Sequence, residues 1–318
     1  MRKHYPLFLC CFGLWVLAGY GQQPEAFTLS DFQMRGPVKV CVVKAQYGEE
    51  RFEFDREGRL RKSLTRYGPE DYDITYYRYR DSILYERRDE VYRSGDFDPR
   101  TSIAHIYERD SATGPVQTET ILSYDRSIQE KVDYRYNDRG ILQRMVRVTP
   151  EGVDDTRLTY DTYQGEETIS YVRNGELQRS VRRSGSRMGS IPVRVVLTKE
   201  YSDGLPREAV EETLDMQGRR LKEVRFAYDT QKESFVPRET RKWTYNPESF
   251  PETETLVEHP AGGGRSEPIV RKYLYHMDGA NPSNWVRQIV TPENQYVVRA
   301  ITYYEEVPAG AVADSLRH

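Results

Sequence analysis

The stretch Phe52-Glu53-Phe54-Asp55-Arg56-Glu57-Gly58-Arg59-Leu60 decides the fold, because its pattern returns at Tyr134-Arg135-Tyr136-Asn137-Asp138-Arg139-Gly140-Ile141-Leu142. Both copies read aromatic, any residue, aromatic, Asp or Asn, two residues, Gly, and then Leu within two positions. Degraded copies occur elsewhere in the chain. A recurring phrase of this kind predicts an architecture built from repeated units.

Each copy of the phrase has the chemistry of a strand, a turn and a return strand. Aromatic residues two apart share one face of a strand. Asp55 and Asn137 can accept backbone N–H groups at the turn, and Gly58 and Gly140 supply the left-handed conformation that closes it. One hairpin cannot bury its own rings, so neighbouring units must pack together.

The rest of the chain also favours strands over helices. It contains 25 Tyr against 10 Phe and 3 Trp, and tyrosine suits half-buried pleated surfaces. Stretches with helical spacing of apolar residues are missing, whereas turn signals such as Asn174-Gly175 are frequent. We predict an all-β protein, an antiparallel meander of repeated hairpins that forms an extended twisted sheet or a sandwich. Little helix is expected outside a leader.

The first residues have the plan of a secretory signal peptide, which we place at residues 1–21. A basic start precedes an apolar run and small residues, and the run is shorter than the ~20 residues that span a bilayer. We therefore expect an exported protein, in the periplasm or at the cell surface, without a transmembrane span in the mature chain. Cys41 is then the only mature cysteine, and its apolar surroundings in 38–43 predict a buried, inert thiol.

The domain organisation is predicted from one polar stretch. Residues 181–190 are rich in Arg, Ser and Gly and poor in apolar side chains, which is typical of a flexible linker. It would separate a first hairpin lobe at 22–180 from a second at 191–306. Residues 307–318 are expected to form a flexible tail.

Charge excludes some partners. The 47 basic and 50 acidic residues nearly cancel to a net charge of -3, and no basic stripe suited to nucleic acid is present. Charged residues occur on both faces of the expected strands, which argues against a membrane barrel.

The Tyr-Asp dipeptide resembles the YD repeat of the Rhs-type family. It stands at Tyr72-Asp73, Tyr124-Asp125, Tyr160-Asp161 and Tyr228-Asp229. The last part of the chain is similar to the closing unit of small exported YD-like proteins of Gram-negative bacteria, although His276 replaces the turn Asp and an insertion separates Gly279 from Asn284. The resemblance implies a β-sheet architecture and an envelope or extracellular location.

Catalytic motifs are not visible. The histidines lack metal-ligand spacing, and His105 is expected on a strand facing water. Adjacent acidic pairs such as Glu166-Glu167 would point to opposite faces of a strand. We therefore predict no catalytic residue, no metal and no cofactor.

The function hypothesis is a non-catalytic binding or scaffolding role in the cell envelope, with a glycan or an envelope protein as partner. Aromatic side chains would carry the binding, and the candidates are Trp285, Tyr273, Tyr275, Trp243 and Tyr245. The same rings could instead be packed in the core. The alternative function is a glycan-processing hydrolase, whose carboxylate pair the sequence does not locate.

Overall fold

A computed structural model describes residues 26–45, 48–110, 116–260, 264 and 266–305. The predicted leader and tail lie outside these residues. The described chain forms one short 3-10 helix, η1 (Leu29–Phe32), and 21 strands. The strands are β1 (Val38–Ala45), β2 (Gly48–Phe54), β3 (Leu60–Arg66), β4 (Tyr72–Arg80), β5 (Ile83–Arg93), β6 (Asp96–Phe97), β7 (Ile103–Asp110), β8 (Val116–Ser123), β9 (Ile128–Tyr136), β10 (Leu142–Thr149), β11 (Gly152–Tyr163), β12 (Glu166–Arg173), β13 (Glu176–Met188), β14 (Ile191–Ser202), β15 (Leu205–Leu214), β16 (Arg220–Asp229), β17 (Ser234–Tyr245), β18 (Pro251–Glu258), β19 (Ile269–Met277), β20 (Trp285–Thr291) and β21 (Gln295–Tyr303).

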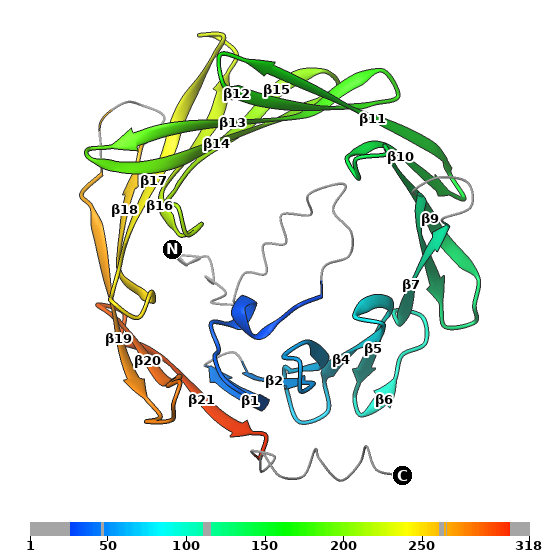
Figure 1. The fold of residues 1–318 in the computed structure, drawn as a ribbon, viewed down its shortest axis with the longest axis vertical. Helices are drawn as coiled ribbons and strands as arrows, with labels where there is room; N and C mark the ends of the chain where they lie inside the picture. Colours follow the sequence, from blue (N-terminus) through cyan, green and yellow to red (C-terminus); the bar gives the residue numbers. More distant parts are fainter. Residues whose placement is uncertain (1–25, 46–47, 111–115, 261–263, 265, 306–318) are drawn as a thin grey trace, which may run out of the picture.

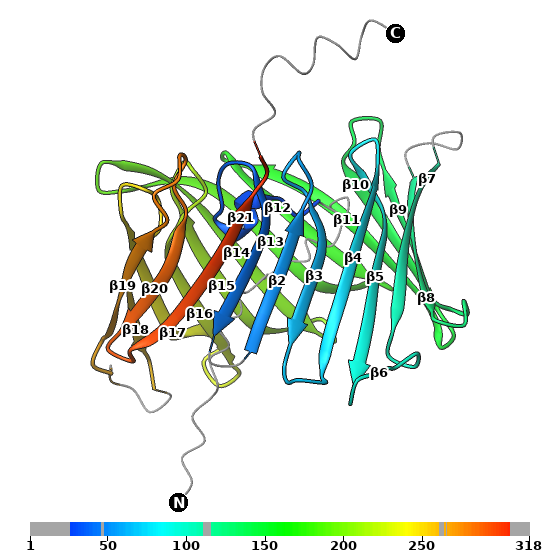
Figure 2. The same cartoon turned by 90° about the horizontal axis from the view of Figure 1, so that it is seen from below.

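The strands form a closed antiparallel barrel, which Figure 1 shows from one end and Figure 2 from the side. Apart from the short β6, each strand pairs with the next along the chain, and β1 pairs with β21 to close the wall. The two-residue β6 pairs only with the end of β5, which pairs directly with β7, so the wall consists of the other 20 of the 21 strands. The antiparallel meander is confirmed, but the expected extended sheet or sandwich was wrong.

The interior of this barrel is wide. Twenty strands about 4.8 Å apart and tilted by about 40° place opposite backbone walls roughly 40 Å apart. Side chains reach only a short way into a lumen of that width, as in the larger barrels that enclose water.

An inner segment, residues 26–37, lies inside the barrel against β1 and β2 (Figure 1). The Leu60 N–H donates to the carbonyl of Phe27. The Phe32 ring packs on Phe52 and Phe54, with centroids 4.6 and 5.4 Å away. Phe52 and Phe54 therefore point into the lumen. Side chains alternate between the two faces along each strand, and residues paired across neighbouring strands share a face, so the inward and outward residues of the other strands follow from these two.

Cys41 belongs to the apolar cluster beneath the inner segment. Its side chain is fully buried in β1, and burial raises the pKa of the thiol to about 11. The predicted burial of this thiol is confirmed. The raised pKa keeps the thiol protonated at neutral pH, as expected for an inert group.

The outer face of the barrel carries charges along its strands. Arg51 and Glu53 alternate with the inward Phe52 and Phe54, and their side chains pair at 2.8 Å on the outside. Outward ion pairs elsewhere in the described wall include Arg78–Glu86, Lys131–Asp133 and Arg144–Asp155. The predicted presence of charge on both faces is confirmed. No helix in the described part of the chain is long and apolar enough to cross a membrane.

The linker expected at 181–190 is a hairpin instead. Residues 181–188 belong to β13, which pairs with β12 as far as Arg183 and with β14 as far as Met188, and only Gly189 and Ser190 form the turn. Backbone hydrogen bonds hold this polar strand in place, so it needs no apolar side chains. The two expected lobes are parts of one continuous wall.

The repeated phrase forms the turn that its chemistry predicts. Asp55 Oδ1 accepts hydrogen bonds from the N–H groups of Glu57 and Arg59, and Gly58 has φ 79°. Asn137 and Gly140 reproduce this arrangement between β9 and β10. Asp215 forms a third copy that the sequence phrase did not reveal.

Tyrosine hydroxyls tie neighbouring hairpins together beside these turns. The return strand contains a β-bulge there, and the register shifts in four hairpins of one rim. A tyrosine on the following strand donates its hydroxyl to the carbonyl of the residue that starts the bulged strand. These rim tyrosines and their acceptors are Tyr79 to Leu60, Tyr160 to Leu142, Tyr245 to Arg220, and Tyr275 to Pro251, at 2.7–2.9 Å.

Candidate binding site on the lumen wall

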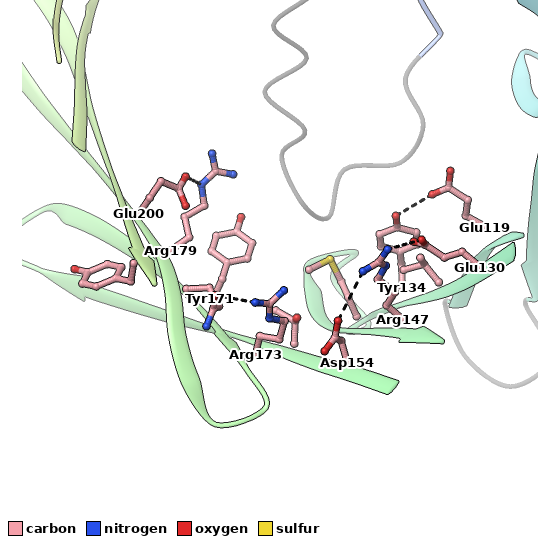
Figure 3. A pocket seen from close by; sticks show the side chains of 14 residues that line it. Glu119, Glu130, Tyr134, Arg147, Asp154, Tyr171, Arg173, Arg179 and Glu200 are labelled. Atoms are coloured by element: carbon pink, nitrogen blue, oxygen red, sulfur yellow. Dashed lines mark hydrogen bonds and ion pairs between the residues drawn. The ribbon is translucent and has the colours of Figure 1, made fainter. Parts of the chain in front are cut away.

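The lumen wall from β8 to β14 contains a hollow of about 450 Å³ (Figure 3). Seven consecutive strands contribute to it, and each presents alternate residues to the lumen. The lining residues are Glu119, Glu130, Val132, Tyr134, Met145, Arg147, Asp154, Thr156, Tyr171, Arg173, Gln178, Arg179, Glu200 and Tyr201.

Strand register brings these residues together in rows across the wall. Arg147 lies opposite Val132 on one side and Asp154 on the other. A second row joins Tyr134, Met145, Thr156 and Arg173, while Tyr171, Arg179 and Glu200 form a third. Aromatic and apolar side chains therefore alternate with guanidinium and carboxylate groups over the surface of the hollow.

Ion pairs fix most of the charged groups. The Arg147 guanidinium lies 2.6 Å from Glu130 and 3.8 Å from Asp154, and Arg179 lies 2.7 Å from Glu200. Burial raises the pKa of Glu200, against the opposing effect of Arg179. These contacts hold the side chains in place along the wall (Figure 3).

Glu119 is the centre of a hydrogen-bonded group at one end of the hollow. His105 Nδ1 lies 2.8 Å from Glu119 Oε1, and the Tyr134 hydroxyl donates to Oε2 at 3.0 Å. Burial acts to raise the pKa of Glu119, but the hydrogen bonds from His105 and Tyr134 outweigh it, so the pKa is lowered. His105 lies on a strand as expected, but it is buried in this cluster and does not face water.

Arg173 has a different environment. Its guanidinium donates to Gln178 Oε1 at 3.1 Å, and no carboxylate of the described residues lies within ion-pair distance of it. Arg173 is exposed at the wall beside Tyr171 (Figure 3). Among the described residues, no group of three His, Cys, Asp or Glu side chains could hold a metal ion.

The structure places the predicted aromatic residues elsewhere, on β17, β19 and β20. Trp285 is completely buried, with the Arg299 guanidinium 3.4 Å from its ring centroid. A ligand cannot stack on a ring covered in this way, so the expectation for Trp285 was wrong. The ring lies where the closing strands meet the inner segment, which is why it packs inside the wall.

The other four predicted residues are half-buried on the lumen face. Tyr275 packs 6.0 Å from Trp285, and Tyr273 donates to Glu254 at 2.8 Å. Tyr245 is a rim tyrosine, and the Arg220 guanidinium lies 5.6 Å from the Trp243 ring centroid. A binding role for these four residues stays a prediction.

Sequence reasoning missed the hollow because its residues come from seven strands. Tyr134 stood in the repeated phrase, but it had no visible link to Tyr171 or Arg173. Alternation along a strand places Tyr171 and Arg173 on one face, but only the register between strands shows which residues stand opposite them.

Comparisons with known proteins do not identify the chain. No family model and no curated protein matches the sequence. The structure is similar to a porin-like protein from Bacteroides uniformis, with 9% identity, 85% of this chain and 99% of that chain covered, and a TM-score of 0.33. A porin-like protein from Bacteroides vulgatus matches with 10% identity, the same coverages and a TM-score of 0.23. A protein with unknown function from Bacteroides fragilis matches with 7% identity, 55% and 92% coverage and a TM-score of 0.19. These TM-scores are too low to establish a relationship.

Proposed function

We propose that the protein is an exported, non-catalytic binding protein of the cell envelope whose lumen hollow holds a glycan. The leader pattern and the resemblance to exported YD-like proteins support the location. The observation that carries the ligand class is the position of Tyr171 in the hollow, flanked along the wall by Arg173 and Arg179 (Figure 3).

The chemistry of the hollow matches that of a sugar chain. Sugars have apolar C–H faces and many hydroxyl groups, so they need ring surfaces and fixed polar groups side by side. Tyr134 and Tyr171 supply rings, and the paired Arg147, Glu130 and Asp154 supply preorganised donors and acceptors. Groups already held by ion pairs lose less side-chain entropy when a ligand binds.

The width of the barrel gives a chain-like ligand access to this wall. Backbone walls roughly 40 Å apart leave room for an extended glycan along the wall that carries the hollow. The polar wall also disfavours a lipid ligand, because a lipid chain would leave the charged groups desolvated without new partners.

Glycan-array binding by the folded chain tests the proposal. Tyr171→Ala removes a ring whose contact with a ligand is worth about 0.5–1.5 kcal/mol, so we expect a roughly three- to tenfold loss of affinity. Tyr163→Ala, at an outward tyrosine that is 73% exposed, is the control and should bind as the unchanged protein does. Protein ligands without any glycan binding, or equal binding by both variants, would contradict the proposal.

A glycan-processing hydrolase is the second candidate. Glu200 combines a raised pKa with a place in the hollow, as a general acid requires, and Asp154 and Glu130 are further carboxylates on the same wall. If the protein is a hydrolase, it releases reducing ends from a bound glycan, and Glu200→Gln abolishes that release while binding persists. Intact ligand after prolonged incubation excludes this candidate.

A further inference from the structure

The charged groups of the hollow are not evenly paired. Its walls contain four carboxylates, Glu119, Glu130, Asp154 and Glu200, and each has a cationic or hydrogen-bonding partner described above. Arg147 and Arg179 pair with three of them. Arg173 differs from these two arginines, because its guanidinium donates to a neutral amide, that of Gln178.

The position of Arg173 suits recognition of an anionic group on a ligand. It follows Tyr171 by two residues on β12, so both side chains stand on the lumen face, one beside the other (Figure 3). A guanidinium can bind a carboxylate through two parallel hydrogen bonds. A ligand stacked on Tyr171 would therefore place a substituent of the same or the next sugar ring near Arg173.

We propose that the hollow selects an acidic glycan, in which a sugar carboxylate pairs with Arg173 while a ring face rests on Tyr171. This inference rests on the proposed function and names the substrate class of the same site. The four carboxylates of the hollow are already engaged by other groups, because Glu130 and Asp154 pair with Arg147, Glu200 pairs with Arg179, and Glu119 is hydrogen-bonded to His105.

Calorimetric titration with a uronic-acid oligosaccharide and its fully methyl-esterified form tests the inference. The two probes share the same sugars and linkages, and only the free acid carries charge. We expect the free acid to bind about tenfold more tightly at low salt, and the difference to shrink as salt is added. Arg173→Gln should bring the two probes to equal affinity.

Arg157→Gln is the matched control. Arg157 lies on β11, next to Thr156 of the hollow, but its side chain points outward and lies 3.7 Å from Asp155. This variant should retain the tenfold preference for the free acid. Circular dichroism should show that both variants keep the β-sheet spectrum.

Other outcomes separate the two proposals. Equal affinity of the unchanged protein for both probes would overturn the acidic-glycan inference and leave glycan binding standing. A preference that survives Arg173→Gln would show that the carboxylate binds elsewhere, which also overturns it. The proposed function fails as well if the protein binds neither probe and also shows no binding to a neutral glycan that Tyr171→Ala weakens.

Discussion

At the scale of the residue, the hydroxyl group explains why this chain uses tyrosine where phenylalanine would also fill the space. A β-bulge beside each turn disturbs the ladder, and the carbonyl that starts the return strand accepts a side-chain donor. The rim tyrosines supply that donor. Each unit of the repeat is thereby tied to the next by one hydrogen bond in addition to the strand pairing.

Tyr79→Phe tests this role. The Tyr79 hydroxyl donates to Leu60 at 2.8 Å, and burial raises its pKa, so it remains a donor at all physiological pH values. We expect the variant to lose about 1 kcal/mol of unfolding free energy, measured by urea denaturation. Tyr163→Phe on the outer face should change stability by less than half as much. Equal effects would show that the rim hydroxyl has no special contribution.

Glu119 gives a pH-dependent prediction. Its folded-state pKa is lowered, so its contribution to stability is complete above the unfolded pKa of about 4.3 and is lost as the pH falls through the folded value. Glu119→Gln should therefore destabilise the protein at pH 7 and have a smaller effect near pH 3. Urea midpoints at the two pH values measure the difference, and a constant difference between the variant and the unchanged protein would refute the assignment.

At the scale of the element, one turn design recurs along a single rim. An Asp or Asn side chain accepts backbone N–H groups, and a residue with positive φ closes the turn. Asp278 forms a related turn between β19 and β20, where it accepts from the N–H groups of Ala280 and Asn284. His276 is a strand residue opposite Arg287, so the turn carboxylate comes from Asp278, two residues further along the chain.

Alanine at the turn glycines separates backbone strain from steric contact. Gly58 and Gly140 both have positive φ, but an added Cβ at Gly58 would lie 3.1 Å from Leu29 Cδ1, whereas Gly140 has open space. We expect Gly140→Ala to cost about 1 kcal/mol and Gly58→Ala to cost more. Gly68→Ala, which meets neither condition, should be nearly neutral. Thermal unfolding of the three variants would contradict this explanation if Gly68→Ala were the most destabilised.

At the scale of the whole molecule, closure of the wall gives every long strand two neighbours. The β1 and β21 ladder runs from Val38–Tyr303 to Lys44–Val298 and removes the two edges that an open sheet would expose. The inner segment covers the lumen face near this seam, where Arg299 donates to the carbonyl of Phe32. The ends of the described chain therefore hold the barrel shut together.

Proline at Val42 should disrupt that closure. Val42 pairs with Arg51 on β2 and with Ala300 on β21, so a proline in this position removes a ladder donor inside the wall. We expect a loss of about 3 kcal/mol or more and an expanded particle in small-angle scattering. Val42→Thr keeps the backbone donor and should retain a compact, hollow particle. A compact Val42→Pro variant of unchanged stability would argue against closure by this ladder.

The outer surface makes a further prediction about the whole molecule. Ion pairs such as Arg78–Glu86 and Arg144–Asp155 lie on the face that lipid would contact in a membrane barrel. Charged residues on a lipid face cost about 2–4 kcal/mol each near the bilayer midplane. The folded protein should therefore partition into the aqueous phase in a detergent phase-separation assay. Recovery in the detergent phase would contradict the expectation, drawn from charge on both strand faces, that lipid does not surround the barrel.

Local features of the fold could be predicted from the sequence, and long-range ones could not. The turn at Asn174 and Gly175 is present with positive φ at both residues, as the dipeptide predicted. The polar stretch at 181–190 was misread because a strand between two neighbours needs few apolar residues. Trp285 was misread because composition does not show that the inner segment and Arg299 cover its ring.

The sequence by itself determined the strands, their alternating faces and the turns of the repeated phrase, because these depend on residues only a few positions apart. The tertiary structure alone decided that the meander closes, that Tyr171 and Arg173 join side chains of six other strands around one hollow, and that Trp285 is buried. Closure and register depend on the combined twist, tilt and bulges of all the strands around the wall. The sequence of a single hairpin does not specify that combined geometry.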